Sequence, residues 1–182
     1  MSSFIRSFSE ISQLPNDSIN EYCFIGRSNV GKSSIINSIL KENIAKSSST
    51  PGKTKLINFF QFKKIRLVDL PGYGFANVSK SEQEKLADLI FKYLTTRKNI
   101  QIVFLICDFG VITPQDKETY DYLIQNGLNV IVLLNKIDRY SNNEINSQLP
   151  KIIRYLNIIK ENTISISSKK NININKIIGY LK

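Results

Sequence analysis

The feature that most constrains the fold is a glycine-rich run, GRSNVGKS at residues 26–33, that lies between two apolar segments. Residues 22–25 predict a buried strand, and residues 33–40 predict a helix whose apolar positions are Ile35, Ile36, Ile39 and Leu40. The run fits G-x-x-x-x-G-K-[ST], in which loop N–H groups and the helix dipole face phosphate groups. An ordinary glycine-rich turn could also precede a helix, but the strand before it and the helix after it favour phosphate binding.

The rest of the chain alternates strand-like runs with longer amphipathic segments, which is typical of helices packed on a mostly parallel sheet. We expect further strands at residues 56–62, 65–69, 100–107, 130–134 and 163–166, and helices at 81–96, 114–126, 142–159 and 174–181. The strands at 56–62 and 65–69 should form an antiparallel hairpin. Ser81 and Glu84 predict a capping box, and Pro150 predicts a kink or restart in its helix.

The polar segment at residues 42–54 and the glycine-containing segment at residues 70–80 are predicted to be loops. The whole pattern predicts an α/β, three-layer fold, with a mostly parallel six-stranded sheet, one antiparallel strand, and helices on both faces. At 182 residues the chain has the usual length of one domain. We therefore expect a single domain over residues 1–182, with residues 1–20 as an N-terminal extension.

Residues of the glycine-rich run and of a second run at 69–72 are predicted to carry the chemistry of phosphate and metal binding. Lys32 should reach the β- and γ-phosphates, and the Ser33 hydroxyl should bind Mg²⁺. Asp69 ends a predicted strand and opens a D-x-x-G run, in which the carboxylate orients Mg²⁺ and the N–H of Gly72 contacts the γ-phosphate. Such a run is common in loops by chance, but its position at a strand end strengthens the interpretation.

The run NKID at residues 135–138 follows another apolar strand and predicts recognition of a guanine base. Asp138 can accept hydrogen bonds from both N1–H and N2–H of guanine, and adenine offers no such pair of donors. A solvated, charged loop is the alternative. A weaker match, formed by Ser167, Ser168 and Lys169, follows the last strand, where GTPases hold guanine O6 through backbone N–H groups. Together these runs predict binding of GTP and GDP.

The composition of the chain limits the type of catalysis, the location and the partner that we expect. The chain has no histidine, which excludes a histidine-based catalytic triad. No apolar run approaches the ~20 residues of a spanning helix, so we expect a cytoplasmic protein with no membrane partner. The net charge of +10 favours a polyanionic partner such as RNA, although an AT-rich genome would also raise the lysine content.

With these motifs in place, the chain resembles the YihA/EngB/YsxC family of ribosome-biogenesis GTPases, within the TrmE–Era-related group. The resemblance covers nearly the whole chain and rests on the runs GRSNVGKSS at 26–34, TPGKT at 50–54 and DLPGYG at 69–74, together with Asn58, Phe59 and Arg97. It implies the three-layer P-loop GTPase fold and a role in assembling the large ribosomal subunit.

The resemblance also assigns roles to residues. It implies that Thr54 senses Mg²⁺ and the γ-phosphate, and that residues 42–55 and 70–80 are two switch loops. The expected metal ligands are Ser33, Thr54 and Asp69, and the expected catalytic residues are Lys32, Thr54 and Gly72. The expected nucleotide-binding set is Gly26, Arg27, Ser28, Asn29, Val30, Gly31, Lys32, Ser33, Ser34, Pro51, Gly52, Thr54, Asp69, Gly72, Asn135, Lys136, Asp138, Ser167, Ser168 and Lys169.

Two residues bear on the rate of hydrolysis, one within this set and one next to it in the sequence. Tyr73 stands where Ras-like proteins place a catalytic glutamine, and tyrosine orients water poorly, so intrinsic hydrolysis should be slow. Asn29 matches the asparagine that helps to hold K⁺ near the phosphates in TrmE-like proteins, which suggests K⁺ as a further cofactor. The chain departs from the family at Gly110 and Val111, where relatives carry an arginine and a histidine, and at Asn135, where close relatives often use threonine.

Three functions fit these observations. The leading hypothesis is a monomeric, GTP-gated assembly factor whose partner is the large ribosomal subunit or its precursor, through rRNA and ribosomal protein. The second is a nucleotide-responsive RNA-binding scaffold that does not require turnover. The third is a cell-division or stress GTPase with a protein partner, in which the basic charge is a by-product of genome composition.

Overall fold

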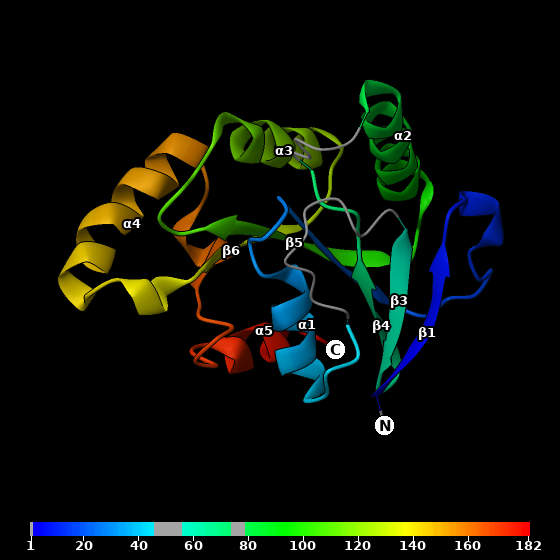
Figure 1. The fold of residues 1–182 in the computed structure, drawn as a ribbon, viewed down its shortest axis with the longest axis horizontal. Coiled ribbons are helices and arrows are strands. Elements are labelled where there is room, and N and C mark those ends of the chain that lie inside the picture. Colours follow the sequence, from blue (N-terminus) through cyan, green and yellow to red (C-terminus); the bar gives the residue numbers. More distant parts are fainter. Residues whose placement is uncertain (1, 46–55, 74–78) are drawn as a thin grey trace.

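Strands from both ends of the chain form one mixed sheet in a computed structural model that describes residues 2–45, 56–73 and 79–182 (Figure 1). The strand order within these residues is β1-β3-β4-β2-β5-β6-β7. The strands are β1 (Ser2–Phe8), β2 (Glu21–Gly26), β3 (Ile57–Phe62), β4 (Ile65–Asp69), β5 (Ile100–Asp108), β6 (Val130–Asn135) and β7 (Thr163–Ser165). Only β3 runs against its neighbours, because it pairs antiparallel with both β1 and β4 while the other described pairs are parallel.

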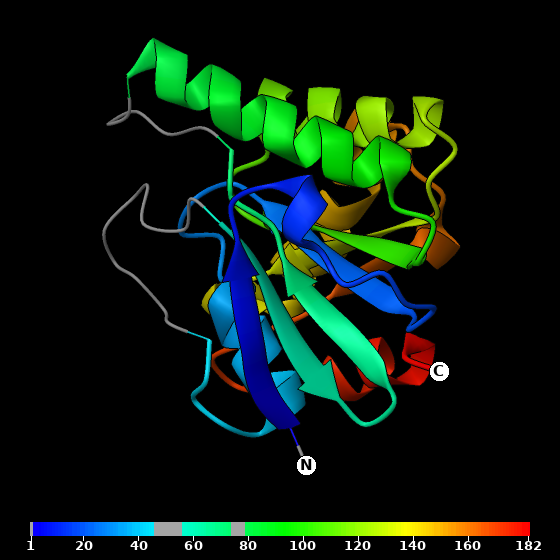
Figure 2. The same cartoon turned by 90° about the vertical axis from the view of Figure 1, so that its right-hand side faces the viewer.

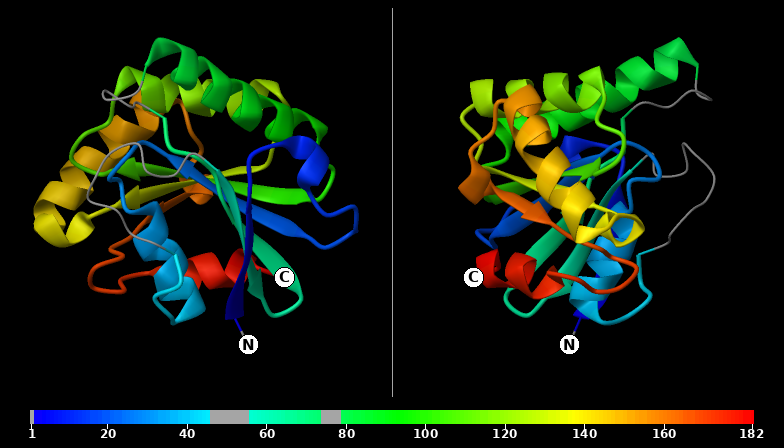
Figure 3. Two further views of the ribbon diagram at one scale, coloured as in Figure 1. Left: turned by 45° about the vertical axis from the view of Figure 1, so that its right-hand side comes forward. Right: turned by 90° about the vertical axis from the view of Figure 1, so that its left-hand side faces the viewer.

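Helices cover both faces of this sheet. They are α1 (Lys32–Leu40), α2 (Lys80–Thr96), α3 (Pro114–Gln125), α4 (Asn142–Leu156) and α5 (Ile174–Tyr180), with short 3₁₀ turns η1 (Ile11–Gln13), η2 (Ile137–Arg139) and η3 (Lys160–Asn162). Figures 1 and 3 show α2, α3 and α4 on one face and α1 and α5 on the other. The predicted three-layer α/β fold is confirmed. None of the described helices is both long and apolar enough to cross a bilayer.

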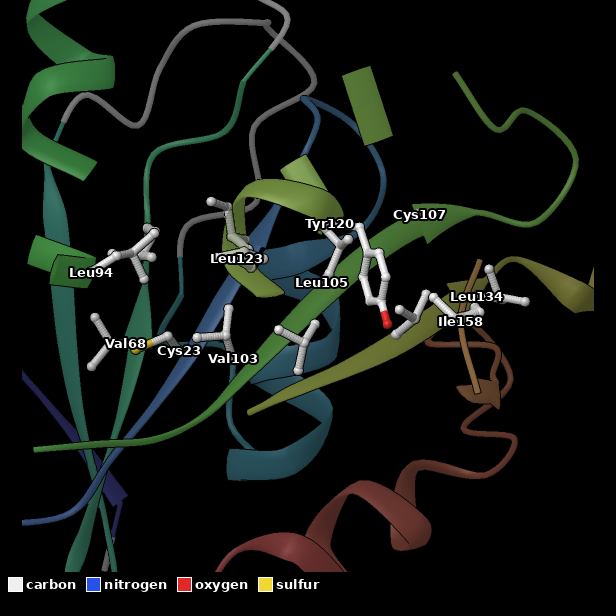
Figure 4. Close-up of a cluster of buried hydrophobic side chains, with 14 of the residues drawn as sticks. Cys23, Val68, Leu94, Val103, Leu105, Cys107, Tyr120, Leu123, Leu134 and Ile158 are labelled. Atoms are coloured by element: carbon white, nitrogen blue, oxygen red, sulfur yellow. The ribbon is translucent and has the colours of Figure 1, made fainter. Parts of the chain in front are cut away.

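The two cores follow from the alternation of side chains along buried parallel strands. In β5, Val103 and Leu105 face the core under α2, α3 and α4, whereas Phe104 and Ile106 face the core under α1 and α5. Figure 4 shows the first core, in which Leu123 of α3 lies over the strands that carry Cys23 and Leu105. Both faces of the central strands are therefore buried, which fixes their register and the positions of their ends.

Within the described residues, the sheet has one strand more than the six predicted. The additional strand is β1, which lies beside β3 at the edge of the sheet (Figure 2) and belongs to the residues predicted to be an N-terminal extension. Its aromatic rings pack on β3, with ring centroids 5.6 Å apart for Phe4 and Phe60 and 5.0 Å apart for Phe8 and Phe59. The pairing register shifts between Phe4 and Arg6. This irregularity interrupts the two-residue alternation from which a strand would be predicted.

Two helix predictions need correction. Helix α2 begins after Ser79, whose hydroxyl accepts a hydrogen bond from the backbone N–H of Glu82, so Ser79 rather than Ser81 is the N-cap. Both serines precede a glutamate by three residues, and the sequence alone does not choose between them. Helix α4 does not restart at Pro150, and it ends at Leu156 rather than at residue 159. Pro150 is exposed, so the carbonyl that loses its helical partner there can bond to water.

Candidate nucleotide-binding site

The parallel strands bring polar residues together at the carboxyl edge of the sheet. Strands β2, β4, β5 and β6 end at Gly26, Asp69, Asp108 and Asn135, and the strand registers align Phe24 with Asp69 and Asp108 with Asn135. Ligands of open α/β sheets bind outside this edge. The predicted phosphate, metal and base motifs therefore meet at the expected place.

The glycines of the phosphate loop are required by close contacts. A Cβ atom at Gly26 would lie 2.4 Å from the carbonyl oxygen of Ile106 in β5. Gly31 is the N-cap of α1 and has φ 102°, and a Cβ there would lie 2.3 Å from Nδ2 of Asn135. A side chain at either position would push the loop away from the strands that support it.

Lys32 and Asp69 lie close together on the predicted phosphate side of the site. Lys32 Nζ lies 3.9 Å from Oδ1 of Asp69, and the two side chains are 10% and 4% exposed. Oδ1 of Asp69 has no hydrogen-bond partner among the described residues. Burial raises the pKa of the Asp69 carboxyl, while Lys32 and a hydrogen bond from Asn58 oppose that rise. A buried, incompletely paired carboxylate beside a lysine is a position that a ligand cation can satisfy.

The donor set fits Mg²⁺. The ion prefers oxygen ligands and is commonly held by one or two carboxylates, waters and phosphate oxygens. The unpartnered Oδ1 of Asp69 supplies one such oxygen, and Ser33 in the first turn of α1 carries a hydroxyl. No cluster of three or more His, Cys, Asp or Glu side chains that could hold a metal occurs in the described part of the chain, so the nucleotide itself would complete the coordination.

Gly72 lies directly against the phosphate loop. A Cβ there would lie 3.0 Å from the carbonyl oxygen of Gly26 and 3.4 Å from Lys32 Nζ. The backbone N–H of Ser28 donates to the carbonyl oxygen of Tyr73, 3.3 Å away. The segment after β4 is thus joined to the loop that is predicted to bind phosphate.

On the base side, Asn135 links two loops. Its Nδ2 donates to the carbonyl oxygen of Val30 at 2.7 Å and to Oγ of Ser168 at 3.2 Å, and its Oδ1 accepts from the N–H of Ser168 at 3.0 Å. Lys136, at φ 73°, places its ammonium group 2.6 Å from Oδ2 of Asp108. Asn135 therefore joins the phosphate loop to the loop after β7, and Lys136 is held against the end of β5.

The Asp138 carboxylate, the predicted acceptor for guanine, receives a hydrogen bond from the loop after β7. It is half-buried, and its Oδ1 accepts a hydrogen bond of 2.6 Å from Oγ of Ser167. This bond lowers the pKa of the Asp138 carboxyl, so the group is ionised at neutral pH. Lys169 in the same loop is exposed.

Most of the predicted site residues in the described part of the chain lie at the carboxyl edge of the sheet. Some do not, and the sequence analysis missed other residues that contact this region. Pro51, Gly52 and Thr54 lie outside the described residues. The Arg27 side chain does not face the site between Lys32 and Asp69; its Nε lies 3.2 Å from Oδ1 of Asp116 and its Nη2 lies 2.6 Å from the carbonyl oxygen of Val111.

Asp116 was not predicted as a partner of the phosphate loop, because its contact with Arg27 spans 89 positions. The sequence departure at Gly110 also has a structural counterpart. A Cβ at this position would lie 1.7 Å from the hydroxyl of Tyr140. A larger residue there would require Tyr140 to move.

A phosphate loop, a D-x-x-G segment and an N-K-x-D segment at the carboxyl edge of a mixed sheet define a P-loop GTPase. A family model described as 50S ribosome-binding GTPase matches residues 21–136. The chain belongs to the EngB family of GTP-binding proteins and is a GTPase.

The relatives match over most of their length. A "probable GTP-binding protein EngB" from Mycoplasma pneumoniae is 42% identical over 171 residues, which cover 94% of this chain and 89% of that protein. A protein of the same description from Finegoldia magna is 48% identical over 167 residues, with coverage of 88% and 83%. A crystal structure of a probable GTP-binding protein EngB aligns with a TM-score of 0.75 at 26% identity, over 88% of this chain and 96% of that chain.

Proposed function

We propose that the protein is a GTP-gated switch in the assembly of the large ribosomal subunit, with slow GTP hydrolysis. The observation that carries the switch is the contact between the segment at Gly72 and the phosphate loop beside Lys32. A residue at this position can report the γ-phosphate, which is present in GTP and absent in GDP. The state of the nucleotide would then decide whether the protein binds its partner.

In this proposal the nucleotide is held from both ends. Residues 26–34 bind the phosphates, Lys32 neutralises charge at the β- and γ-phosphates, and Asp138 selects guanine, supported by Asn135, Lys136 and the loop at 167–169. Ser33, Asp69 and Thr54 hold Mg²⁺, which neutralises phosphate charge when bound. Lys32, Gly72 and Thr54 stabilise the transferred phosphoryl group. Pro51 and Gly52 belong to the same switch loop as Thr54.

Slow hydrolysis is supported by the placement of Tyr73. Its hydroxyl lies 2.9 Å from Oδ1 of Asp116 and donates to that carboxylate, so the side chain is bonded to α3. It also lacks the amide with which a glutamine orients water. Asn29 lies exposed in the phosphate loop at φ 64°, where its amide oxygen could bind K⁺. Equal turnover in K⁺ and Na⁺ buffers would remove K⁺ from the proposal.

The proposed partner is the large ribosomal subunit or its precursor, bound through rRNA and ribosomal protein by a monomer in the cytoplasm. The description of the matching family model as a 50S ribosome-binding GTPase supports this partner. The net charge of +10 supports it further, because clustered lysine and arginine attract a phosphate backbone.

Co-sedimentation with purified bacterial large and small subunits tests the proposal. We expect the protein to pellet with large subunits in a non-hydrolysable GTP analogue and to remain in solution with GDP. Lys32→Ala, which should lose the response to GTP, is the matched variant. Equal binding with GDP and with the GTP analogue would contradict the switch and favour an RNA-binding scaffold. Absence of binding to either subunit would contradict the ribosomal partner.

A further inference from the structure

We propose that Asp116 of α3 is a positioning residue for GTP hydrolysis, because it joins the phosphate loop to the segment that follows Gly72. The Asp116 side chain is fully buried and has donors on both oxygens. Oδ1 accepts from Nε of Arg27 at 3.2 Å and from the hydroxyl of Tyr73 at 2.9 Å. One carboxylate oxygen thus holds side chains from two separate loops.

The same two residues are also paired through their backbones. Arg27 and Tyr73 form an isolated parallel bridge, and the N–H of Ser28 donates to the Tyr73 carbonyl oxygen. Burial raises the pKa of the Tyr73 hydroxyl, so this hydroxyl keeps its proton and acts as the donor to Asp116. Tyr73 is therefore fixed at its backbone by the phosphate loop and at its hydroxyl by α3.

Helix capping alone does not account for these contacts. Asp116 is the third residue of α3 and forms a capping box with Thr113. That box uses only Oδ2, which accepts from the N–H of Thr113 at 2.8 Å and from its hydroxyl at 2.9 Å. Oδ1 remains for Arg27 and Tyr73. The ion pair with Arg27 compensates a buried charge that capping would leave unbalanced.

The arrangement has a consequence for the reaction. Tyr73 directly follows Gly72. A Cβ added at Gly72 would lie 3.4 Å from Lys32 Nζ. If Asp116 no longer holds Tyr73 and Arg27, the hydrogen bond from Ser28 and the backbone bridge must fix Gly72 against the phosphate loop. Small displacements of groups near a reacting centre can reduce turnover about 100-fold. Because GDP lacks the γ-phosphate, its affinity should depend little on this contact.

The test compares Asp116→Asn and Tyr73→Phe with Thr113→Val as a matched control. Thr113→Val deletes one bond to Oδ2 and weakens the cap, but leaves both side-chain contacts to Oδ1. Single-turnover and steady-state hydrolysis give kcat and KM for GTP, and fluorescence titration gives the affinity for GDP. We expect kcat to fall about tenfold or more in Asp116→Asn and somewhat less in Tyr73→Phe. GDP affinity should change less than about twofold in both, and Thr113→Val should retain the turnover of the unmodified protein.

The double variant adds a second criterion. If the two side chains act through one contact, Asp116→Asn with Tyr73→Phe should be no slower than the slower single variant. Tyr73→Phe keeps the ring in the core, and it remains informative if Asp116→Asn fails to fold. Unchanged kcat in Tyr73→Phe, or equal losses in Asp116→Asn and Thr113→Val, would overturn the proposal. Parallel losses of kcat and GDP affinity would overturn it as well. Absence of turnover in the unmodified protein would count instead against the GTPase site.

Discussion

Two buried carboxylates at opposite ends of the sheet differ in how completely they are paired. Glu21 begins β2 at the amino edge and is 0% exposed, and Asp69 ends β4 at the carboxyl edge and is 3% exposed. Glu21 Oε2 accepts from Arg97 Nε at 3.0 Å and from the Tyr93 hydroxyl at 2.6 Å. Asp69 has one oxygen without a hydrogen-bond partner in the described part of the chain, and a lysine lies 3.9 Å away.

The difference shows which charge serves the fold and which is available to a ligand. Around Glu21, Arg97 also donates to the carbonyl oxygen of Pro15, and Arg66 pairs with both Glu21 and Asp17. These bonds fasten the segment before β2 to the sheet. A paired charge contributes to a fixed structure, whereas an unpaired buried oxygen costs stability until a cation reaches it. Replacing each carboxylate should therefore have opposite effects.

The largest expected effect is that of Glu21→Gln. The change leaves Arg97 and Arg66 without their shared anion in a buried position, so the free energy of unfolding should fall by about 3–5 kcal/mol. Urea denaturation without nucleotide measures it, with the exposed Glu84→Gln as control, for which less than about 0.5 kcal/mol is expected. The folded fraction should bind GDP normally. A loss no larger than that of the control would show that the Glu21 cluster contributes little to stability.

Lys32→Ala should have its largest effect on turnover. Loss of one donor to the transition state typically reduces kcat by about 10²–10³. Lys64→Ala, at an exposed lysine in the turn between β3 and β4, is the control for loss of a positive charge. Release of phosphate from GTP is the measurement. A Lys32 variant that keeps more than about a tenth of the activity would place the phosphate site elsewhere.

Sequence and structure agree most closely at the carboxyl edge of the sheet. The phosphate loop, Asp69 and the NKID run were predictable because each motif is local and each follows a buried apolar strand. The Glu21 cluster and Asp116 were not predicted. Glu21 lies 76 positions from Arg97, and Asp116 lies 43 positions from Tyr73. Pairings over such distances depend on how the strands and helices pack.

The missed strand has a different cause. Residues 2–8 carry only part of a strand pattern, because the irregularity between Phe4 and Arg6 shifts the side chains out of alternation. Its pairing depends on aromatic contacts with Phe59 and Phe60 of β3, which follow it in the chain by more than fifty residues. The start of α2 was predicted wrongly for a simpler reason, since two serines offered equivalent caps.

Asp69→Asn sharpens the comparison through its dependence on pH. The folded-state pKa of Asp69 lies above its ordinary value of 3.8. The stability that protonation provides is therefore fully present below 3.8 and is lost as pH rises through the folded-state pKa. At pH 7 without nucleotide, Asp69→Asn should be about 1–2 kcal/mol more stable than the unmodified protein, and the difference should shrink towards pH 4.

Urea denaturation at a series of pH values measures this difference, and GTP titrations with and without Mg²⁺ measure the accompanying loss of metal dependence. Glu21→Gln serves as the comparison, because it should lower stability under the same conditions. If Asp69→Asn is also destabilising at pH 7, the unpartnered oxygen is not a source of strain. The contrast between the two carboxylates would then not hold.

Ser167→Ala should have the smallest effect, because it removes one hydrogen bond to Asp138. The burial and the pairing of Asp138 lie between those of the two buried carboxylates. Asp138 is half-buried and receives one side-chain hydrogen bond, which lowers its pKa. Losing that bond leaves the carboxylate charged at pH 7 but free to rotate, and a bond of about 1 kcal/mol corresponds to a roughly fivefold loss of GDP affinity. Ser147→Ala, which removes an exposed hydroxyl bonded to the Glu144 carbonyl oxygen in α4, is the control. Unchanged GDP affinity in Ser167→Ala would mean that guanine itself is sufficient to orient Asp138, so that pairing before the ligand arrives matters only for fully buried carboxylates.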